Sequence, residues 1–148
     1  MGVRASLSGI MLAVTVCAAC PAAAGTLEED MEAENARWLA VFAKAEPLAF
    51  ASLYTKDAVI IAQGWPPLTG RTAMVQFWNK LLEMGWRSEK LDIESTWREG
   101  KIAYQAARWT VVIGGGANAK ARTGNMVRLF EQQADGSWLT KMQMYNLD

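Results

Sequence analysis

The spacing of apolar residues predicts a long helix at the start of the folded part of the chain. Thr26 followed by Glu29 has the pattern of a capping box, which indicates a helix over residues 26–45. Its apolar residues recur every three or four positions and form one stripe. Glu34 lies on the same stripe, a turn before Trp38.

Two further helices and a strand follow. Pro47 suits the first turn of a short second helix in the stretch EPLAFASLY. Asp57 then opens a strand over residues 58–62, which is dense in β-branched side chains. A third helix is predicted over residues 71–84, and its apolar face consists of Met74, Phe77, Trp78 and Leu81.

The apolar period changes to two in the second half of the chain. Strands are predicted from Trp86 to Arg98 and over residues 101–113, 119–132 and 137–146. In the first of these, Leu91, Ile93 and Trp97 alternate with polar residues, which is typical of a half-buried antiparallel strand. Helices followed by strands with tight turns predict an α+β fold. We expect about three N-terminal helices over the concave face of a cone-shaped, curved antiparallel sheet, with a pocket between them.

The first 24 residues have the pattern of a signal peptide. Arg4 precedes an apolar segment, and Ala22-x-Ala24 suits cleavage before Gly25. We therefore expect one domain over residues 25–148 in an exported protein, periplasmic or secreted, with no membrane span once the leader is removed. The alternatives are an uncleaved anchor and a lipoprotein attached at Cys20.

Composition excludes several kinds of site. The sequence has no histidine, and both cysteines, Cys17 and Cys20, lie in the leader. The remaining chain therefore has no disulfide, no Cys/His zinc site and no Ser-His or Cys-His nucleophile. Of the 15 basic side chains only Arg4 lies in the leader, which leaves 14 basic and 15 acidic side chains and no indication of nucleic-acid binding. We expect neither a metal nor a cofactor.

Three stretches, LYTKDAVI, GWPPLTGR and DGSWLTKMQMYNLD, resemble a known family in their order and spacing. They are similar to the SnoaL-like or ketosteroid-isomerase-like branch of the nuclear-transport-factor-2-like superfamily, over about residues 35–146. The resemblance implies a cone whose cavity opens at one end and which binds a small molecule. It also implies a homodimer formed through the sheet.

The resemblance also assigns the positions of the isomerase's acid and base groups. The general base corresponds to Ala62, the tyrosine that donates to the oxyanion corresponds to Trp38, and the neutral aspartic acid corresponds to Asn125. Alanine accepts no proton, an indole only donates, and an amide does not ionise. Whether the protein is an enzyme stays uncertain, but ketosteroid isomerisation by the known route is not expected.

Other polar residues are candidates for the cavity wall. Lys141, Gln143 and Tyr145 share one face of the last strand, and the resemblance turns that face, with Asn125 and Val127 of the preceding strand, toward the cavity. Such a wall suits a neutral, mostly apolar ligand with one or two hydrogen-bonding groups; alternatively, the amides satisfy their own neighbours. The predicted ligand-binding residues are Trp38, Tyr54, Trp65, Asn125, Val127, Gln143 and Tyr145.

Trp65 follows the first strand in the loop GWPP. It is expected either at the rim of the cavity or packed on the edge of the third helix. Glu34 is the one carboxylate on the apolar stripe of the first helix and becomes a general base if it reaches the pocket, although its place near the helix start favours solvent. Asp57 is expected to stabilise a turn.

Three functions follow from these residues. The first is an exported domain that binds a small, mostly apolar ligand. The second is an isomerase or cyclase with a non-standard acid and base, for which Glu34 and Tyr145 are candidates. The third is a structural, dimerising module, which gains support if Trp and Met side chains fill the cavity.

Overall fold

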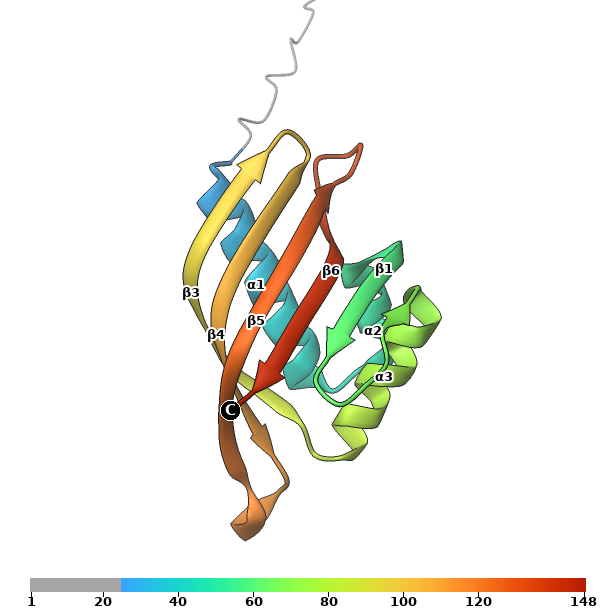
Figure 1. Ribbon diagram of the computed structural model, residues 1–148, viewed down its shortest axis with the longest axis vertical. Coiled ribbons are helices and arrows are strands. Elements are labelled where there is room, and N and C mark those ends of the chain that lie inside the picture. The colour runs from blue at the N-terminus through green and yellow to red at the C-terminus, as the bar shows by residue number, and fades with distance from the viewer. Residues whose placement is uncertain (1–24) are drawn as a thin grey trace, which may run out of the picture.

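The computed structural model describes residues 25–148, apart from the side chains of Ser88 and Glu89. The predicted signal peptide, residues 1–24, and both cysteines lie outside the described residues. Three helices precede most of the sheet, which crosses the molecule in front of α1 (Figure 1). The elements are α1 (Leu27–Lys44), α2 (Pro47–Phe50), β1 (Tyr54–Ala62), β2 (Leu68–Thr69), α3 (Arg71–Glu83), β3 (Arg87–Glu99), β4 (Ile102–Ile113), β5 (Lys120–Gln132) and β6 (Trp138–Leu147).

Helix α1 begins and ends close to the predicted positions. The Thr26 hydroxyl accepts a hydrogen bond from the Glu29 backbone, and the Glu29 carboxylate accepts one from the Thr26 backbone, so the capping box is present. The helix ends where Ala45 adopts a left-handed conformation with φ of 52°. Its buried stripe consists of Met31, Asn35, Trp38 and Phe42. Asn35, and not Glu34, is therefore the polar residue of this stripe.

The sheet has the order β2-β1-β6-β5-β4-β3. Neighbouring strands are antiparallel except β1 and β6, which run parallel, so the curved sheet is mixed. The predicted α+β class is confirmed, with the helices on one side of an open sheet (Figure 1). Strand β1 begins at Tyr54, four residues earlier than expected. Asp57 consequently lies within the strand, and its predicted role in a turn is wrong.

Aromatic side chains fill the space between the helices and the inner face of the sheet. Trp78 of α3 stacks on Phe50 at 5.0 Å between ring centroids and meets the Trp38 ring edge-on at 5.9 Å. Trp109 of β4 contacts both Trp38, at 6.0 Å, and Tyr145, at 4.9 Å. Trp38, Trp78 and Trp109 are at most 1% exposed. Tilted and edge-on contacts between large rings contribute strongly to such cores, so this packing stabilises the fold.

Two register shifts change which side chains face inward. In β3, a shift between Ile93 and Ser95 adds a residue, so Leu91 and Ile93 face the inner side whereas Trp97 lies on the outer face, 47% exposed. The prediction of one apolar face for β3 is therefore wrong. In β6, a second shift makes Lys141 the extra residue, so Lys141 does not share the inner face with Gln143.

The expected orientation of β5 is also wrong. Met126, Arg128 and Phe130 are buried on the inner face, and their neighbours Asn125 and Val127 point to the outer face. A strand exposes alternate residues on opposite faces, so an error of one position reverses every side chain. Asn125 therefore cannot stand in the interior beside Trp38.

Candidate functional site

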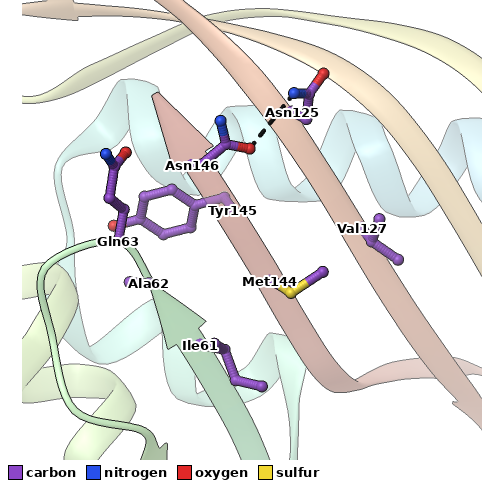
Figure 2. A pocket seen from close by; sticks show the side chains of 8 residues that line it. All are labelled: Ile61, Ala62, Gln63, Asn125, Val127, Met144, Tyr145 and Asn146. Atoms are coloured by element: carbon purple, nitrogen blue, oxygen red, sulfur yellow. Dashed lines mark hydrogen bonds between the residues drawn. The ribbon is translucent and has the colours of Figure 1, made fainter. Parts of the chain in front are cut away.

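A hollow of about 250 Å³ lies on the outer face of the sheet, where β1 ends beside β6 and β5 (Figure 2). Three large apolar side chains, Ile61, Val127 and Met144, form one part of its wall. Gln63, Asn125 and Asn146 lie along the opposite part, and Ala62 and Tyr145 lie between them (Figure 2). The hollow therefore has an apolar side and an amide side.

Local structure explains why these side chains meet. The register pairs Ile61 with Met144 and Met144 with Val127, so three neighbouring strands place an apolar row across the outer face. The same strand pairing places Asn125 opposite Asn146, two residues away from Val127 and Met144. Ile61 is 38% exposed and Met144 44% exposed, so this row forms a contiguous apolar patch on the surface.

The amides of the hollow are held in place by the fold. Asn125 accepts a hydrogen bond from Arg108 at 2.9 Å and donates weakly to Asn146 at 3.4 Å. The side-chain oxygen of Gln63 accepts from the Leu147 backbone at 2.8 Å. Because that oxygen is occupied, the amino group of Gln63 remains available to donate, and Asn146 still has its own amino group. These groups can bind the carbonyl or hydroxyl oxygen of a ligand.

On the inner face, the predicted residues Tyr54 and Gln143 hydrogen-bond to each other. Trp78 Nε1 donates to the Tyr54 hydroxyl at 3.0 Å, and that hydroxyl donates to Gln143 Oε1 at 2.6 Å. Gln143 then donates to Met126 Sδ at 3.7 Å. Burial raises the pKa of Tyr54 far above its ordinary value, so the phenol stays neutral. The inner amide thus satisfies a neighbouring side chain, which was the alternative expected for it.

Two indole N–H groups on the inner face are less well satisfied. Nε1 of Trp38 and Nε1 of Trp86 are buried without a hydrogen bond of normal geometry, although Trp38 lies near enough to the Tyr54 hydroxyl to lower its pKa against the effect of burial. Buried indole N–H groups usually find a partner. Trp38 faces the interior as predicted, but its surroundings are rings of the core.

The two catalytic candidates occupy different environments. Glu34 forms an ion pair with Arg37 at 2.8 Å, and its side chain is 12% exposed. Burial raises the pKa of Glu34, and the guanidinium of Arg37 opposes this increase. Burial likewise raises the pKa of Tyr145, and Tyr54 adds to the effect. A tyrosine with a raised pKa is a poor base at neutral pH, although it can still donate a hydrogen bond.

The positions of the isomerase's acid and base groups hold no carboxylate. Ala62 is 4% exposed, at the end of β1, and Trp38 is in the core, whereas Asn125 lies on the outer face. Among the described residues, the buried polar or charged side chains are Asn35, Thr55, Gln105, Arg128, Thr140 and Gln143. None of these is a carboxylate that could abstract a proton in the described interior.

Trp65 packs on the edge of helix α3, as one of the two expectations proposed. Its ring meets Phe77 edge-on at 5.3 Å, and the side chain remains 38% exposed. Trp65 and Phe77 also line a smaller hollow of about 140 Å³ with Leu68, Ala73 and Gln76. Trp65 does not line the 250 Å³ hollow, so the predicted ligand-binding set divides between separate places.

Arg128 is the functional candidate that the sequence prediction missed. The sequence prediction did not include it, yet it is 2% exposed on the inner face. The alternating apolar residues Met126 and Phe130 on either side of it could have indicated that orientation.

Among residues 25–148, no helix is long and apolar enough to span a membrane.

Comparisons with known proteins agree with this architecture. A family model described as a SnoaL-like domain matches residues 35–140. A ketosteroid isomerase-like protein from Erwinia carotovora atroseptica SCRI1043 is 20% identical with a TM-score of 0.69, over 83% of this chain and 98% of that chain. An NTF2-like protein with a cystatin-like fold from Novosphingobium aromaticivorans is 16% identical with a TM-score of 0.67, over 81% of this chain and 80% of that chain.

A third similar structure is that of a complex. It is a protein of Catenulispora acidiphila in complex with S-DNPA, 20% identical with a TM-score of 0.69, over 82% of this chain and 93% of that chain. A search of curated proteins finds no match to the chain. Since the identities with the solved structures are low, these likenesses establish the fold alone. The function has to be inferred from the residues of the site.

Proposed function

This chain belongs to the SnoaL-like domain family, and from that premise we propose that it binds a small, mostly apolar molecule in the outer-face hollow. The observation that carries the proposal is the two-sided wall of the hollow, with Ile61, Val127 and Met144 opposite three amides. Ligand pockets commonly combine an apolar surface with a few fixed polar groups in this way. The fold often carries ligand-binding or enzymatic sites, which agrees with this assignment.

The dimensions and polarity of the hollow define the class of ligand. Its volume of about 250 Å³ suits a single ring or a short branched chain. The amides of Gln63 and Asn146 would donate to one carbonyl or hydroxyl oxygen, and the apolar row would contact the rest. Of the predicted residues, Asn125, Val127 and Tyr145 line this hollow. Asn125 and Val127 line it from the outer face of the sheet, opposite to the face expected for them.

The location of the protein is part of the same proposal. The leader pattern of residues 1–24 supports export to the periplasm or the medium, where the domain of residues 25–148 would meet small molecules from outside the cell. N-terminal sequencing of the protein from its native host tests this. A mature N-terminus at or near Gly25 is expected, and a chain that still begins at Met1 would contradict export by cleavage.

A thermal-shift titration with acetophenone and cyclohexanone tests the ligand site. Each probe combines an apolar body with one carbonyl oxygen. A bound compound at about 100 times its dissociation constant adds on the order of 2.7 kcal/mol, which raises the melting temperature by several degrees. Met144→Lys is expected to remove the rise, because it places a charge in the apolar wall of the hollow. The variant should stay folded, since Met144 is already 44% exposed.

Met84→Lys is the matched control. Met84 follows helix α3, is 52% exposed and does not line the hollow, so this variant should keep the full response. An equal loss of response in both variants would contradict the proposed site. So would a response that Met144→Lys leaves unchanged.

A second candidate function is self-association through the outer face of the sheet. The register places two neighbouring apolar rows across five strands: Val59, Met142, Leu129, Tyr104 and Trp97 form one, and Ile61, Met144, Val127 and Ala106 form most of the other. We call these rows the outer stripe. A continuous exposed apolar surface between polar rows commonly marks a protein interface. The filled interior also favours this candidate.

The outer stripe predicts a homodimer. Sedimentation of the purified protein across a range of concentrations should give a dimer that Trp97→Lys dissociates, because Trp97 is 47% exposed and lies on the stripe but outside the hollow. Because the outer stripe and the hollow share Ile61, Met144 and Val127, dissociation by Trp97→Lys should uncover the hollow and strengthen the response to the two probes. A monomer at all concentrations would contradict self-association without affecting the ligand proposal.

A further inference from the structure

Arg128 is a charged residue inside the aromatic core. Its guanidinium lies over the rings of Trp38 and Phe130, at 5.4 and 5.0 Å from their centroids. Nη2 donates to the side-chain oxygens of Asn35 and of Gln105, the latter at 3.2 Å. Within the described part of the chain, no carboxylate lies within ion-pair distance of Arg128.

The charges around Arg128 do not compensate it fully. Glu34 of α1 acts on Arg128 at longer range, but its carboxylate is bound to Arg37 at 2.8 Å. The Tyr54 hydroxyl is neutral. Burial lowers the pKa of Arg128 to about 10, so the side chain remains cationic at neutral pH. Amides and rings therefore hold a buried cation that a carboxylate would stabilise far better, since buried charges are normally paired.

A hollow of about 110 Å³ reaches the two amides that hold this cation. It lies between α1 and strands β3 and β4, and Asn35 and Gln105 belong to its wall. Met31 and Ile93 supply apolar surface, and the Thr96 hydroxyl accepts a hydrogen bond from Gln105 at 3.3 Å. Glu28 and Glu32, both exposed residues of α1, complete the wall.

We propose that this hollow binds a small monocarboxylate, whose oxygens replace the amide oxygens of Asn35 and Gln105 on the guanidinium of Arg128. Carboxylate and guanidinium match in geometry and form the stronger, charge-assisted type of hydrogen bond. The apolar part of the molecule lies against Met31 and Ile93. This site is distinct from the outer-face hollow and does not depend on the function proposed for it.

The acids at the edge of the hollow make the site selective. Glu28 and Glu32 repel a dianion more strongly than a monoanion. Because both residues are exposed, solvent weakens this repulsion. Arg128 acts from a buried position where the effective dielectric constant is lower. A monoanion of short chain length is therefore favoured over sulfate, phosphate or a dicarboxylate.

A nuclear magnetic resonance titration of the purified protein with propionate tests the proposal. The side-chain signals of Arg128, Asn35 and Gln105 should shift with saturation. Chloride and sulfate at the same ionic strength should not produce this saturable shift. Arg128→Met should weaken the binding of propionate by about tenfold or more, the loss expected for a hydrogen bond to a charged group. Arg108→Met, on the outer face, should bind propionate as the unaltered protein does.

Gln105→Glu tests the site without removing the cation. The introduced carboxylate would occupy the position proposed for the ligand, so this nearly isosteric variant should stay folded and lose the response to propionate. A response to propionate that persists in Gln105→Glu would overturn the proposal. Shifts that rise linearly and equally with propionate, chloride and sulfate would also overturn it.

Discussion

The two faces of the sheet use similar residue types for different purposes. Against the inner face, Trp78 of helix α3 is fully buried and contacts rings from three elements. On the outer face, Trp97 is 47% exposed and contacts Tyr104 of the adjacent strand, at 5.9 Å. The inner apolar residues hold the fold together, whereas the outer ones remain available for a ligand or a second copy. Apolar residue type alone therefore does not distinguish core from exposed surface in this chain.

Replacing one tryptophan on each side of the sheet, Trp78 of α3 and Trp97 of β3, should separate the two roles most clearly. Trp78→Ala leaves a cavity among Phe50, Trp38 and Tyr145 and removes the donor to Tyr54, so we expect a loss of about 3–5 kcal/mol of unfolding free energy. Trp97→Ala should lose roughly 1 kcal/mol or less, as exposed substitutions usually do. Chemical denaturation measures both. Similar losses in the two variants would contradict the contrast between the faces.

A pair of tyrosines tests the polar part of the same contrast. Tyr54→Phe removes the hydroxyl that joins Trp78 to Gln143, and it leaves buried polar groups without their partner. We expect a loss of about 1–3 kcal/mol. Tyr104→Phe, on the outer stripe, should change stability by about 0.5 kcal/mol or less. If Tyr54→Phe proves as mild as its control, the inner hydrogen bonds contribute little to the fold.

The smallest expected effect concerns an ion pair on the outer face. Lys141 donates to Asp57 at 2.6 Å, and this contact lowers the pKa of Asp57 and raises the pKa of Lys141. A lowered carboxyl pKa stabilises the fold above the pKa of the unfolded chain, and this contribution disappears as pH falls through the folded value. A raised lysine pKa stabilises at lower pH and loses its contribution as pH rises through the folded value.

The stabilising contribution of the pair is therefore full between the ordinary pKa values of an unfolded chain's aspartic acid and lysine, about 4 and about 10. Lys141→Met is expected to make the melting temperature slightly less dependent on pH between neutrality and about pH 3, and the exposure of both groups limits the effect. Lys101→Met, a change at an exposed turn residue, serves as the control. An unchanged pH profile in Lys141→Met would show that the pair does not contribute.

The sequence predicted the elements much better than it predicted the faces of the strands. The capping box at Thr26 and Glu29 placed α1, and Asp135-Gly136 marked the turn between β5 and β6. These signals are local, because a cap or a turn depends on neighbouring residues. The resemblance to the SnoaL-like family then supplied the arrangement of the sheet.

The candidate site was harder to predict because it depends on register. The extra residues in β3 and β6 follow from pairing with distant strands, and no local pattern reveals them. The flanking residues Met126 and Phe130 could indicate that Arg128 faces inward, but its hydrogen bond to Asn35 of α1 depends on tertiary packing that no local pattern reveals. Asn125 and Val127 were assigned to the wrong face and still line the outer-face hollow, which periodicity could not have indicated.

The most direct test of the central claim is to locate a bound probe on the protein. Nuclear Overhauser effects between acetophenone and the methyl groups of Ile61, Val127 and Met144 should appear under saturating conditions. The methyl group of Met74, which is 0% exposed in the core, should show none. Contacts restricted to these three residues are the result that the account predicts. Contacts with Met74, or the absence of contacts with all three outer residues, would contradict it.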